Sequence, residues 1–256
     1  MKIAILGAGN MGGAIARGLA QGGLVATKDI TVTNPSVGKL DKLKAEYPEI
    51  NVSTDNSVAS EADMVIIAVK PWKVEEVVKP LHLRRPQIVV SVAAGISFET
   101  LKEYVDIDMT MFRVIPNTAI SCLASTTLIA ECNASTEQTQ MLLDLFNEMG
   151  LSILIEEKQM TAATALTSCG IAFVLKYVQA AMQAGVEVGI RPKDAMKMLA
   201  QTLDGAAQLL LTDENTHPAI EIDKVTTPGG ITIKGVNQLD HDGFTSAVIN
   251  AVKACM

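Results

Sequence analysis

KIAILGAGNMG, residues 2–12, is the segment from which the architecture of this chain can be predicted. Its first five residues form a short, mainly apolar run that predicts a buried strand, and the pattern over residues 12–21 predicts a helix. Between them stands G-x-G-x-x-G, the glycine spacing of a dinucleotide-binding turn. Gly7 would permit the tight turn, Gly9 would let the backbone approach a pyrophosphate, and Gly12 would let the helix pack closely on the strand. An ordinary glycine-rich turn is the alternative.

Short apolar runs alternate with helical patterns through the first 157 residues. Strands are predicted at 30–33, 64–69, 88–92, 110–114, 125–130 and 152–155, and helices at 38–47, 74–79 and 137–149. Strands separated by helices need crossover connections, so the sheet should be mostly parallel. We therefore predict a Rossmann-like α/β domain over residues 1–157.

The pattern becomes helical from residue 158 onward. One apolar helix is predicted over 160–188, interrupted near Cys169-Gly170, and a second runs from Pro192 to about residue 211. A polar connection is predicted at 212–227 and a last helix at 232–254. This half is too apolar for an exposed bundle, so its surface should bury against a second subunit. We predict an all-α dimerisation and substrate domain over residues 158–256.

Composition excludes several classes of protein. The formal net charge is −7 and Lys and Arg form no run, so nucleic acid and anionic membranes are poor partners. We expect no apolar run to approach the ~18 residues of a membrane helix. The four cysteines fit no zinc spacing, and we expect no metal site but reduced, mostly buried thiols. A strand at the very start leaves no room for a signal peptide, which predicts a cytoplasmic protein.

The end of the second predicted strand bears on the choice of cofactor. Enzymes that use NAD usually place Asp or Glu there to hold the ribose hydroxyls. This chain has Asn34-Pro35-Ser36, with no carboxylate to repel a 2′-phosphate and with Lys39 one helical turn further on. The pattern predicts NADPH, with NADH weaker. The alternative for this tripeptide is a turn with a helix cap, and both roles can hold together.

Four motifs and a downstream segment resemble the pyrroline-5-carboxylate reductase family in order and spacing. The motifs are GAGNMG at 7–12, AVKP at 68–71, AAG at 93–95 and RVIPN at 113–117. The downstream segment contains His217-Pro218 and DKVTTPGGIT at 223–232, which is far more specific than the glycine motif. The resemblance implies NADPH-dependent reduction of 1-pyrroline-5-carboxylate to L-proline, the last step of proline biosynthesis. It also implies an intertwined homodimer, with stacking into decamers in some members.

The predicted site residues fall into two groups. The cofactor-binding residues are Gly7, Gly9, Asn10, Met11, Gly12, Asn34, Ser36, Asn56, Ala68, Val69, Lys70, Pro71, Ala93, Ala94, Gly95 and Asn117. The substrate-binding residues are Thr227, Gly229, Gly230, Ile231 and Thr232. Successive N–H groups at 229–232 could form a nest for the substrate carboxylate, and family similarity gives the Thr232 hydroxyl a catalytic hydrogen bond to the ring nitrogen. The alternative is a capped helix start, with Thr232 as the cap.

The chain departs from the family pattern at the head of the long helix. Where the family usually has SGSGPAY, this chain has Ser168-Cys169-Gly170 followed by Ile171 and Phe173. Gln179 stands where a Glu is common. These departures bear on the local helix start and on any role of a tyrosine hydroxyl.

Two other functions compete with this interpretation. A β-hydroxyacid-dehydrogenase-type reductase has a Lys four residues after a Gly in the long helix, but Val174 occupies that position after Gly170 and Lys176 lies six residues on. A regulatory protein that senses NADPH would not need a second anion site. No His, Lys or Asp catalytic cluster is evident, and an iminium carbon needs mainly positioning to accept a hydride.

Overall fold

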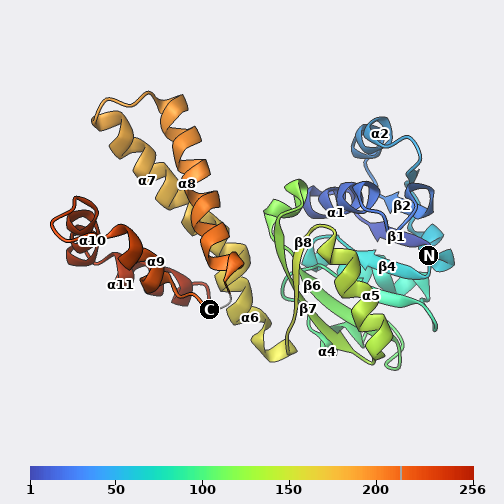
Figure 1. Ribbon diagram of the computed structural model, residues 1–256. Coiled ribbons are helices and arrows are strands. Elements are labelled where there is room, and N and C mark those ends of the chain that lie inside the picture. The colour runs from blue at the N-terminus through green and yellow to red at the C-terminus, as the bar shows by residue number, and fades with distance from the viewer. Residues whose placement is uncertain (214) are drawn as a thin grey trace. The chain divides into compact units, whose positions relative to one another are not determined.

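The structure is a computed structural model and describes residues 1–213 and 215–256. The chain divides into two compact units, Met1–Ser168 and Cys169–Met256 (Figure 1). The first unit is built on an eight-stranded sheet within the described residues. Its strands are β1 (Ile3–Leu6), β2 (Ile30–Thr33), β3 (Asn51–Ser53), β4 (Met64–Ile67), β5 (Ile88–Ser91), β6 (Thr110–Ile115), β7 (Ser125–Cys132) and β8 (Gly150–Leu154).

The strand order β3-β2-β1-β4-β5-β6-β7-β8 places β1 where the chain changes sides. The chain builds β2 and β3 on one side of β1, then returns to build β4 and β5 on the other. Neighbouring strands from β3 to β6 are parallel, β7 is antiparallel to β6, and β8 is parallel to β7. The predicted α/β class with a mostly parallel sheet is confirmed.

Helices cover both faces of this sheet, which is why its central strands are apolar throughout. Ile3 and Ile5 join one hydrophobic cluster, and the alternate residues Ala4 and Leu6 join the cluster on the other face. The helices are α1 (Asn10–Gln21), α2 (Val37–Glu46), α3 (Val74–Val78), α4 (Phe98–Leu101), α5 (Thr136–Asn147) and α6 (Met160–Thr164). Residues of α1, α2 and α5 pack in the first cluster, and residues of α3, α4 and α6 in the second.

Two short elements of this unit were not predicted. β3 has the sequence Asn-Val-Ser and forms only because it pairs with β2 at the edge of the sheet. Its polar residues carry no alternating apolar signal, so its identity depends on a tertiary contact. The four-residue helix α4 begins after Ser97, whose hydroxyl accepts from the Thr100 N–H. It is too short to show a helical period.

The second unit is entirely helical in its described residues. Its helices are α7 (Gly170–Glu187), α8 (Pro192–Thr212), α9 (Pro218–Val225), α10 (Thr232–His241) and α11 (Phe244–Lys253). The predicted interruption near Cys169 is a π-helical turn over Ala165–Cys169. The polar connection predicted at 212–227 is wrong in part because α9 lies within it. The single last helix predicted at 232–254 is also wrong, since Gly243 adopts a left-handed conformation (φ 79°) and separates α10 from α11.

This second unit has almost no buried core of its own. Among its described residues only Ala195 is a buried hydrophobic residue, and large apolar side chains such as Leu175 and Met198 are 62% and 58% exposed.

The helical segment Glu157–Glu187 is long and apolar enough to cross a membrane, judged by length and composition alone. Of its most apolar 18-residue stretch, 6% is buried. The expectation that no apolar run approaches membrane length was therefore wrong.

Candidate dinucleotide and substrate sites

Most of the predicted cofactor residues follow the carboxyl ends of the parallel strands in the first unit. This end of the sheet is called the cofactor edge below. Leu6, the last residue of β1, is level with Thr33 of β2 and Ile67 of β4, and Ile67 is level with Ser91 of β5. The segments after these residues therefore leave the sheet side by side. Because β1 lies at the switch point, a ligand can enter at the carboxyl ends of β1 and β4.

The glycine turn after β1 has the geometry that its sequence predicts. Gly7 has φ 108°, a backbone conformation that residues with a side chain rarely adopt. Its N–H donates to the Thr33 carbonyl at 2.8 Å. A Cβ atom on Gly12 would lie 1.9 Å from the Gly7 carbonyl oxygen and 2.9 Å from the Ala68 Cβ. Gly12 is therefore required by the packing of α1 against β1 and β4. A Cβ on Gly9 would meet nothing within 4 Å, so the space above Gly9 is open.

The amino terminus of α1 is suited to an anion. Gly9 occupies the N-cap position, and within the described residues no side chain caps the helix and no acidic residue lies in its first turn. The first N–H groups of a helix lack intrahelical partners and carry a partial positive charge. Asn10 and Met11, the first two residues of α1, are respectively exposed and half-buried. This end can therefore receive the oxygens of a diphosphate.

Asn34 ties the glycine turn to the end of β2. Its side-chain oxygen accepts from the Ala8 N–H at 3.2 Å, and its side-chain nitrogen donates to the Ser36 carbonyl at 3.0 Å. Asn34 is buried, whereas Ser36 and Lys39 are exposed. Ser36 occupies the N-cap position of α2, but its hydroxyl makes no capping hydrogen bond. The Ser36 hydroxyl and the Lys39 ammonium group are thus available to a group on a ribose.

Asn56 belongs to the same corner. It begins a 3₁₀ turn, Asn56–Glu61, and its side-chain oxygen accepts from the Thr33 hydroxyl at 2.5 Å. Neither Ala8 nor Thr33 was among the predicted site residues, although both hold the predicted asparagines in place. The available signal was a threonine at the last position of β2, next to Asn34. Its contact with Asn56 spans 23 residues and could not be predicted from local sequence.

The ends of β4, β5 and β6 complete this edge. Ala68 and Val69 are half-buried after β4, Lys70 is exposed, and Pro71 begins the 3₁₀ turn Pro71–Lys73. After β5, Ala93 is buried, and Ala94 and Gly95 are exposed. Asn117, which comes two residues after β6, is buried and accepts from the Ala119 N–H at 2.9 Å. Small side chains after β4 and β5 leave the space that a flat ring would need.

The predicted substrate residues lie in the second unit, on the loop before α10. The Gly230 N–H donates to the Thr227 carbonyl at 2.9 Å, which closes a turn in which Gly229 has φ 72°. Ile231, at the N-cap position of α10, is 86% exposed, and Thr232 is the first helical residue. The alternative in which Thr232 caps the helix is wrong, since no side chain in the described residues caps α10. Its N-terminal N–H groups are available to an anion.

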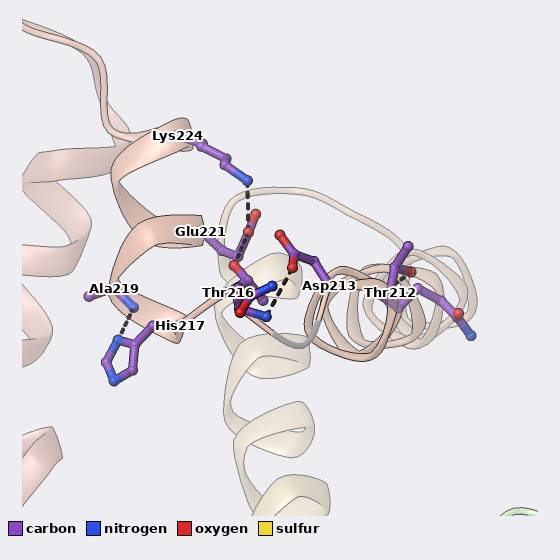
Figure 2. A network of polar contacts seen from close by, with 9 residues as sticks. Thr212, Asp213, Thr216, His217, Ala219, Glu221 and Lys224 are labelled. Carbon is purple, nitrogen blue, oxygen red and sulfur yellow. Dashed lines mark hydrogen bonds and ion pairs between the residues drawn. The ribbon is translucent and has the colours of Figure 1, made fainter.

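A polar network fixes α9 just before this loop (Figure 2). Nδ1 of His217 accepts from the Ala219 N–H at 3.2 Å and caps the helix. Oε1 of Glu221 accepts from the Thr216 hydroxyl at 2.5 Å and from Nζ of Lys224 at 2.8 Å. The hydrogen bond from Lys224 and then that from Thr216 lower the pKa of Glu221. His217 thus has a structural role as the N-cap of α9.

Three further features were considered in the sequence: a metal site, the four cysteines and Lys176. No group of three or more His, Cys, Asp or Glu residues in the described segments could hold a metal ion. The prediction of mostly buried cysteines is wrong, because Cys122 and Cys255 are exposed and Cys132 and Cys169 are half-buried. Lys176, which matters for the dehydrogenase alternative, is exposed and donates to Gln179 at 3.0 Å. It has the position of a surface residue.

The fold and the site at the switch point together define a class, the dinucleotide-binding oxidoreductases with a Rossmann-like domain. A family model described as NADP oxidoreductase, coenzyme F420-dependent, matches residues 2–95. A second, described as pyrroline-5-carboxylate reductase dimerisation, matches residues 157–256. The second match covers the unit whose apolar surface is exposed.

Individual relatives agree with the family models. Pyrroline-5-carboxylate reductase 1 of Dictyostelium discoideum is 37% identical over 98% of this chain, and the chain spans 48% of that protein's length. Reductase 2 of the same organism is 37% identical over 98% of this chain and 89% of its own length. A crystal structure of Plasmodium falciparum pyrroline carboxylate reductase with NADP bound has a TM-score of 0.87 at 26% identity, covering 100% of this chain and 95% of that one. The chain belongs to the pyrroline-5-carboxylate reductase family.

Proposed function

We propose that this protein catalyses the NADPH-dependent reduction of 1-pyrroline-5-carboxylate to L-proline. The observation that carries the proposal is the open, uncapped start of α1 at the switch point of the sheet, behind a glycine turn that packing requires. A diphosphate is the ligand that this geometry suits. Family membership supplies the imino-acid substrate class, since both Dictyostelium relatives are named for it.

The residues of the chain would act mainly by binding and orienting two reactants. When bound, NADPH supplies a hydride to the carbon of the C=N bond. The glycine turn and α1 would hold the diphosphate, and the small residues 68–69 and 93–95 would admit the nicotinamide ring. The 229–232 backbone would hold the substrate carboxylate, and the Thr232 hydroxyl would hydrogen-bond the ring nitrogen. An iminium carbon already carries positive character, so positioning is the main requirement.

Thr232→Ala tests the substrate side of the proposal. Loss of a hydroxyl that contacts a polar ring atom costs about 1–3 kcal/mol, which corresponds to a fall in kcat/KM of roughly 5- to 150-fold. We expect Thr232→Ser to retain most of the activity, because the hydroxyl is kept. Steady-state kinetics of the three proteins provide the measurement. Equal kcat/KM values for wild type and Thr232→Ala would remove Thr232 from the site.

Asn34→Asp tests the proposed preference for NADPH. An aspartate keeps an acceptor for the Ala8 N–H but loses the donor to the Ser36 carbonyl, and it places a negative charge where a 2′-phosphate would lie. We expect the ratio of kcat/KM with NADPH to that with NADH to fall about 10-fold or more, in line with ~1.4 kcal/mol per tenfold change. Ser36→Ala is the matched variant without added charge. A ratio unchanged in Asn34→Asp would show that the 2′-phosphate is held elsewhere.

The proposal includes an oligomer. A homodimer formed through residues 158–256 would cover the apolar side chains that the second unit leaves exposed, and such dimers could then stack into decamers. Lys176 lies inside the long apolar helix, and a charged side chain there would be costly in lipid. These observations favour a second copy of the chain over a bilayer, and a cytoplasmic location. The domain boundary at 157/158 stays a prediction.

Consumption of NADPH with 1-pyrroline-5-carboxylate is the direct test. We expect turnover with this substrate and none with a set of β-hydroxyacids and NADP. Turnover only with the hydroxyacids would support the dehydrogenase alternative, which Val174 and the exposed Lys176 disfavour. NADPH binding without turnover of either substrate would support the regulatory alternative.

A further inference from the structure

Glu157 connects parts of the first unit that are far apart in the sequence. Its Oε1 accepts a hydrogen bond from the Phe98 N–H at 2.8 Å and a second from Nη1 of Arg113 at 2.7 Å. Phe98 begins α4, Arg113 lies on β6, and Glu157 follows β8. Hydrogen bonds to ionised groups are short and stronger than neutral ones, and both contacts have the length of such bonds. One carboxylate oxygen therefore holds three segments together.

Arg113 fixes this carboxylate from inside the protein. The Arg113 side chain is 11% exposed, against 35% for Glu157. On β6 it is level with Ser91 of β5 and Ala130 of β7, so its backbone is held from both sides. Its Nε is buried and has no hydrogen-bond partner among the described residues. Because a buried cation is costly unless it is paired, Arg113 favours a single place for the Glu157 carboxylate.

The contact with Phe98 fixes the far end of the segment 93–97. Two hydrogen bonds nearer to β5 are long, from the Ala93 N–H to the Ser91 hydroxyl at 3.4 Å and from the Ile96 N–H to the Ala93 carbonyl at 3.5 Å. N–H donors usually lie about 2.9–3.0 Å from their acceptors, and longer contacts are weaker. The 2.8 Å bond from Phe98 to Glu157 is therefore a tighter constraint on this segment than either of them.

The Phe98 side chain limits what loss of this hydrogen bond would do. It is buried and packs in the same hydrophobic cluster as Leu101 and Met160. This packing should keep α4 on the sheet even when Glu157 is replaced. The Glu157 carboxylate then controls the orientation of the segment before α4 and not the folding of α4 itself.

We propose that Glu157, held by Arg113, is a positioning residue for hydride transfer. By holding the Phe98 N–H it sets the place of residues 93–95. The inference rests on the proposed function, which assigns the nicotinamide ring to the space beside these residues. The diphosphate would be bound by other contacts, those of the glycine turn and α1. Loss of the Glu157 contact should therefore lower kcat far more than it weakens the binding of NADPH.

Glu157→Ala and Glu157→Gln in the full-length protein test this proposal. The glutamine oxygen can still accept from the Phe98 N–H, whereas alanine offers no acceptor. We expect kcat of Glu157→Ala to fall about 10- to 100-fold, since a misplacement of ~1 Å can cost about 100-fold. The Kd for NADPH should change less than about threefold, and Glu157→Gln should keep kcat within about threefold of the wild type. Both variants should unfold at a lower temperature, because Arg113 loses its counter-ion.

An isotope effect locates the affected step. With NADPH that carries deuterium at the transferred position, the isotope effect on kcat of Glu157→Ala should be at least as large as that of the wild type. A lower kcat with a smaller isotope effect would place the loss in product release and overturn the proposal. An unchanged kcat in Glu157→Ala, or an equal fall in both variants, would also overturn it. Glu99→Ala is the control, since Glu99 is exposed on α4 next to Phe98 and should behave as the wild type.

Hydrogen exchange tests the contact without reference to the reaction. Mass spectrometry of peptides that cover residues 93–98 should show faster exchange in Glu157→Ala but not in Glu157→Gln. Equal exchange in the wild type and Glu157→Ala would show that Glu157 does not hold this segment. If the wild type failed to reduce 1-pyrroline-5-carboxylate, the proposed function would fall, whereas the exchange result would still decide whether Glu157 orders residues 93–98.

Discussion

Gly9→Val should bind NADPH about 5- to 150-fold more weakly than the wild type while its fold stays intact. A Cβ on Gly9 meets no protein atom within 4 Å, so the added side chain extends only into the space assigned to the diphosphate. Displacing the phosphate oxygens from the N–H groups of α1 leaves polar groups unpaired, at a cost of ~1–3 kcal/mol. Titration of NADPH followed by fluorescence gives the Kd, and thermal unfolding reports on the fold.

Gly12→Ala provides the matched comparison. Its Cβ would lie 1.9 Å from the Gly7 carbonyl oxygen, so α1 must move away from β1 and stability should fall by about 1–3 kcal/mol. The two variants thus separate a glycine needed for the ligand from a glycine needed for packing. If Gly9→Val bound NADPH as tightly as the wild type, the diphosphate could not lie on this turn.

Leu175→Asp should prevent dimerisation and reduce activity to near background. Leu175 is 62% exposed on α7 and lines an apolar groove of about 460 Å³ together with Val178, Met182 and Val186. If a second copy covers this groove, the aspartate would be buried without a partner, at a cost of several kcal/mol per copy. Because the second unit has so little core of its own, its helices should lose order when the dimer is lost.

Sedimentation and thermal unfolding at several concentrations measure this effect. The midpoint of unfolding should rise with concentration for the wild type but not for Leu175→Asp. Ile107→Asp is the control, since Ile107 is equally exposed, at 62%, but lies in the first unit. A dimeric, active Leu175→Asp protein would place the subunit interface on another face.

The sequence predicted the elements whose signals are local. β1, β4 and β5 are short runs of mainly apolar residues, so burial on both faces could be predicted from each run alone. β3 could not be predicted, because Asn51–Ser53 becomes a strand only through its pairing with β2. Helix α9 has a local start signal, His217 at the N-cap and Pro218 at the first helical position, inside the segment predicted as a polar connection. Gly243, which lies inside the predicted last helix and adopts a left-handed conformation in the structure, was a further sequence signal that this helix is divided.

In the candidate site, too, roles that depend on local sequence could be predicted and roles that depend on distant contacts could not. Gly7 and Gly12 could be assigned because their roles depend on neighbours in one turn. The role of Asn34 in holding the Ala8 N–H spans 26 residues and was not evident, although Asn34 itself was selected. Exposure of the second unit could be anticipated from its composition. Which of its side chains meet a partner depends on contacts with a second chain, and the sequence carries no local signal for such contacts.

Strands β7 and β8 run opposite to β6 and the other parallel strands, and this determines where the chain leaves the first unit. Leu154, the last residue of β8, is level with Ile129 and, through it, with Val114 of β6. Glu157 then pairs with Arg113 at 2.7 Å, and the helical segment after it carries Ser168 to the Pro116 carbonyl. This segment is thus anchored at both ends, and its exit point is the cofactor edge. One residue inserted between the anchors would rotate Ser168 by about 100° around the helix axis and advance it by about 1.5 Å, so the length of the segment is under geometric constraint.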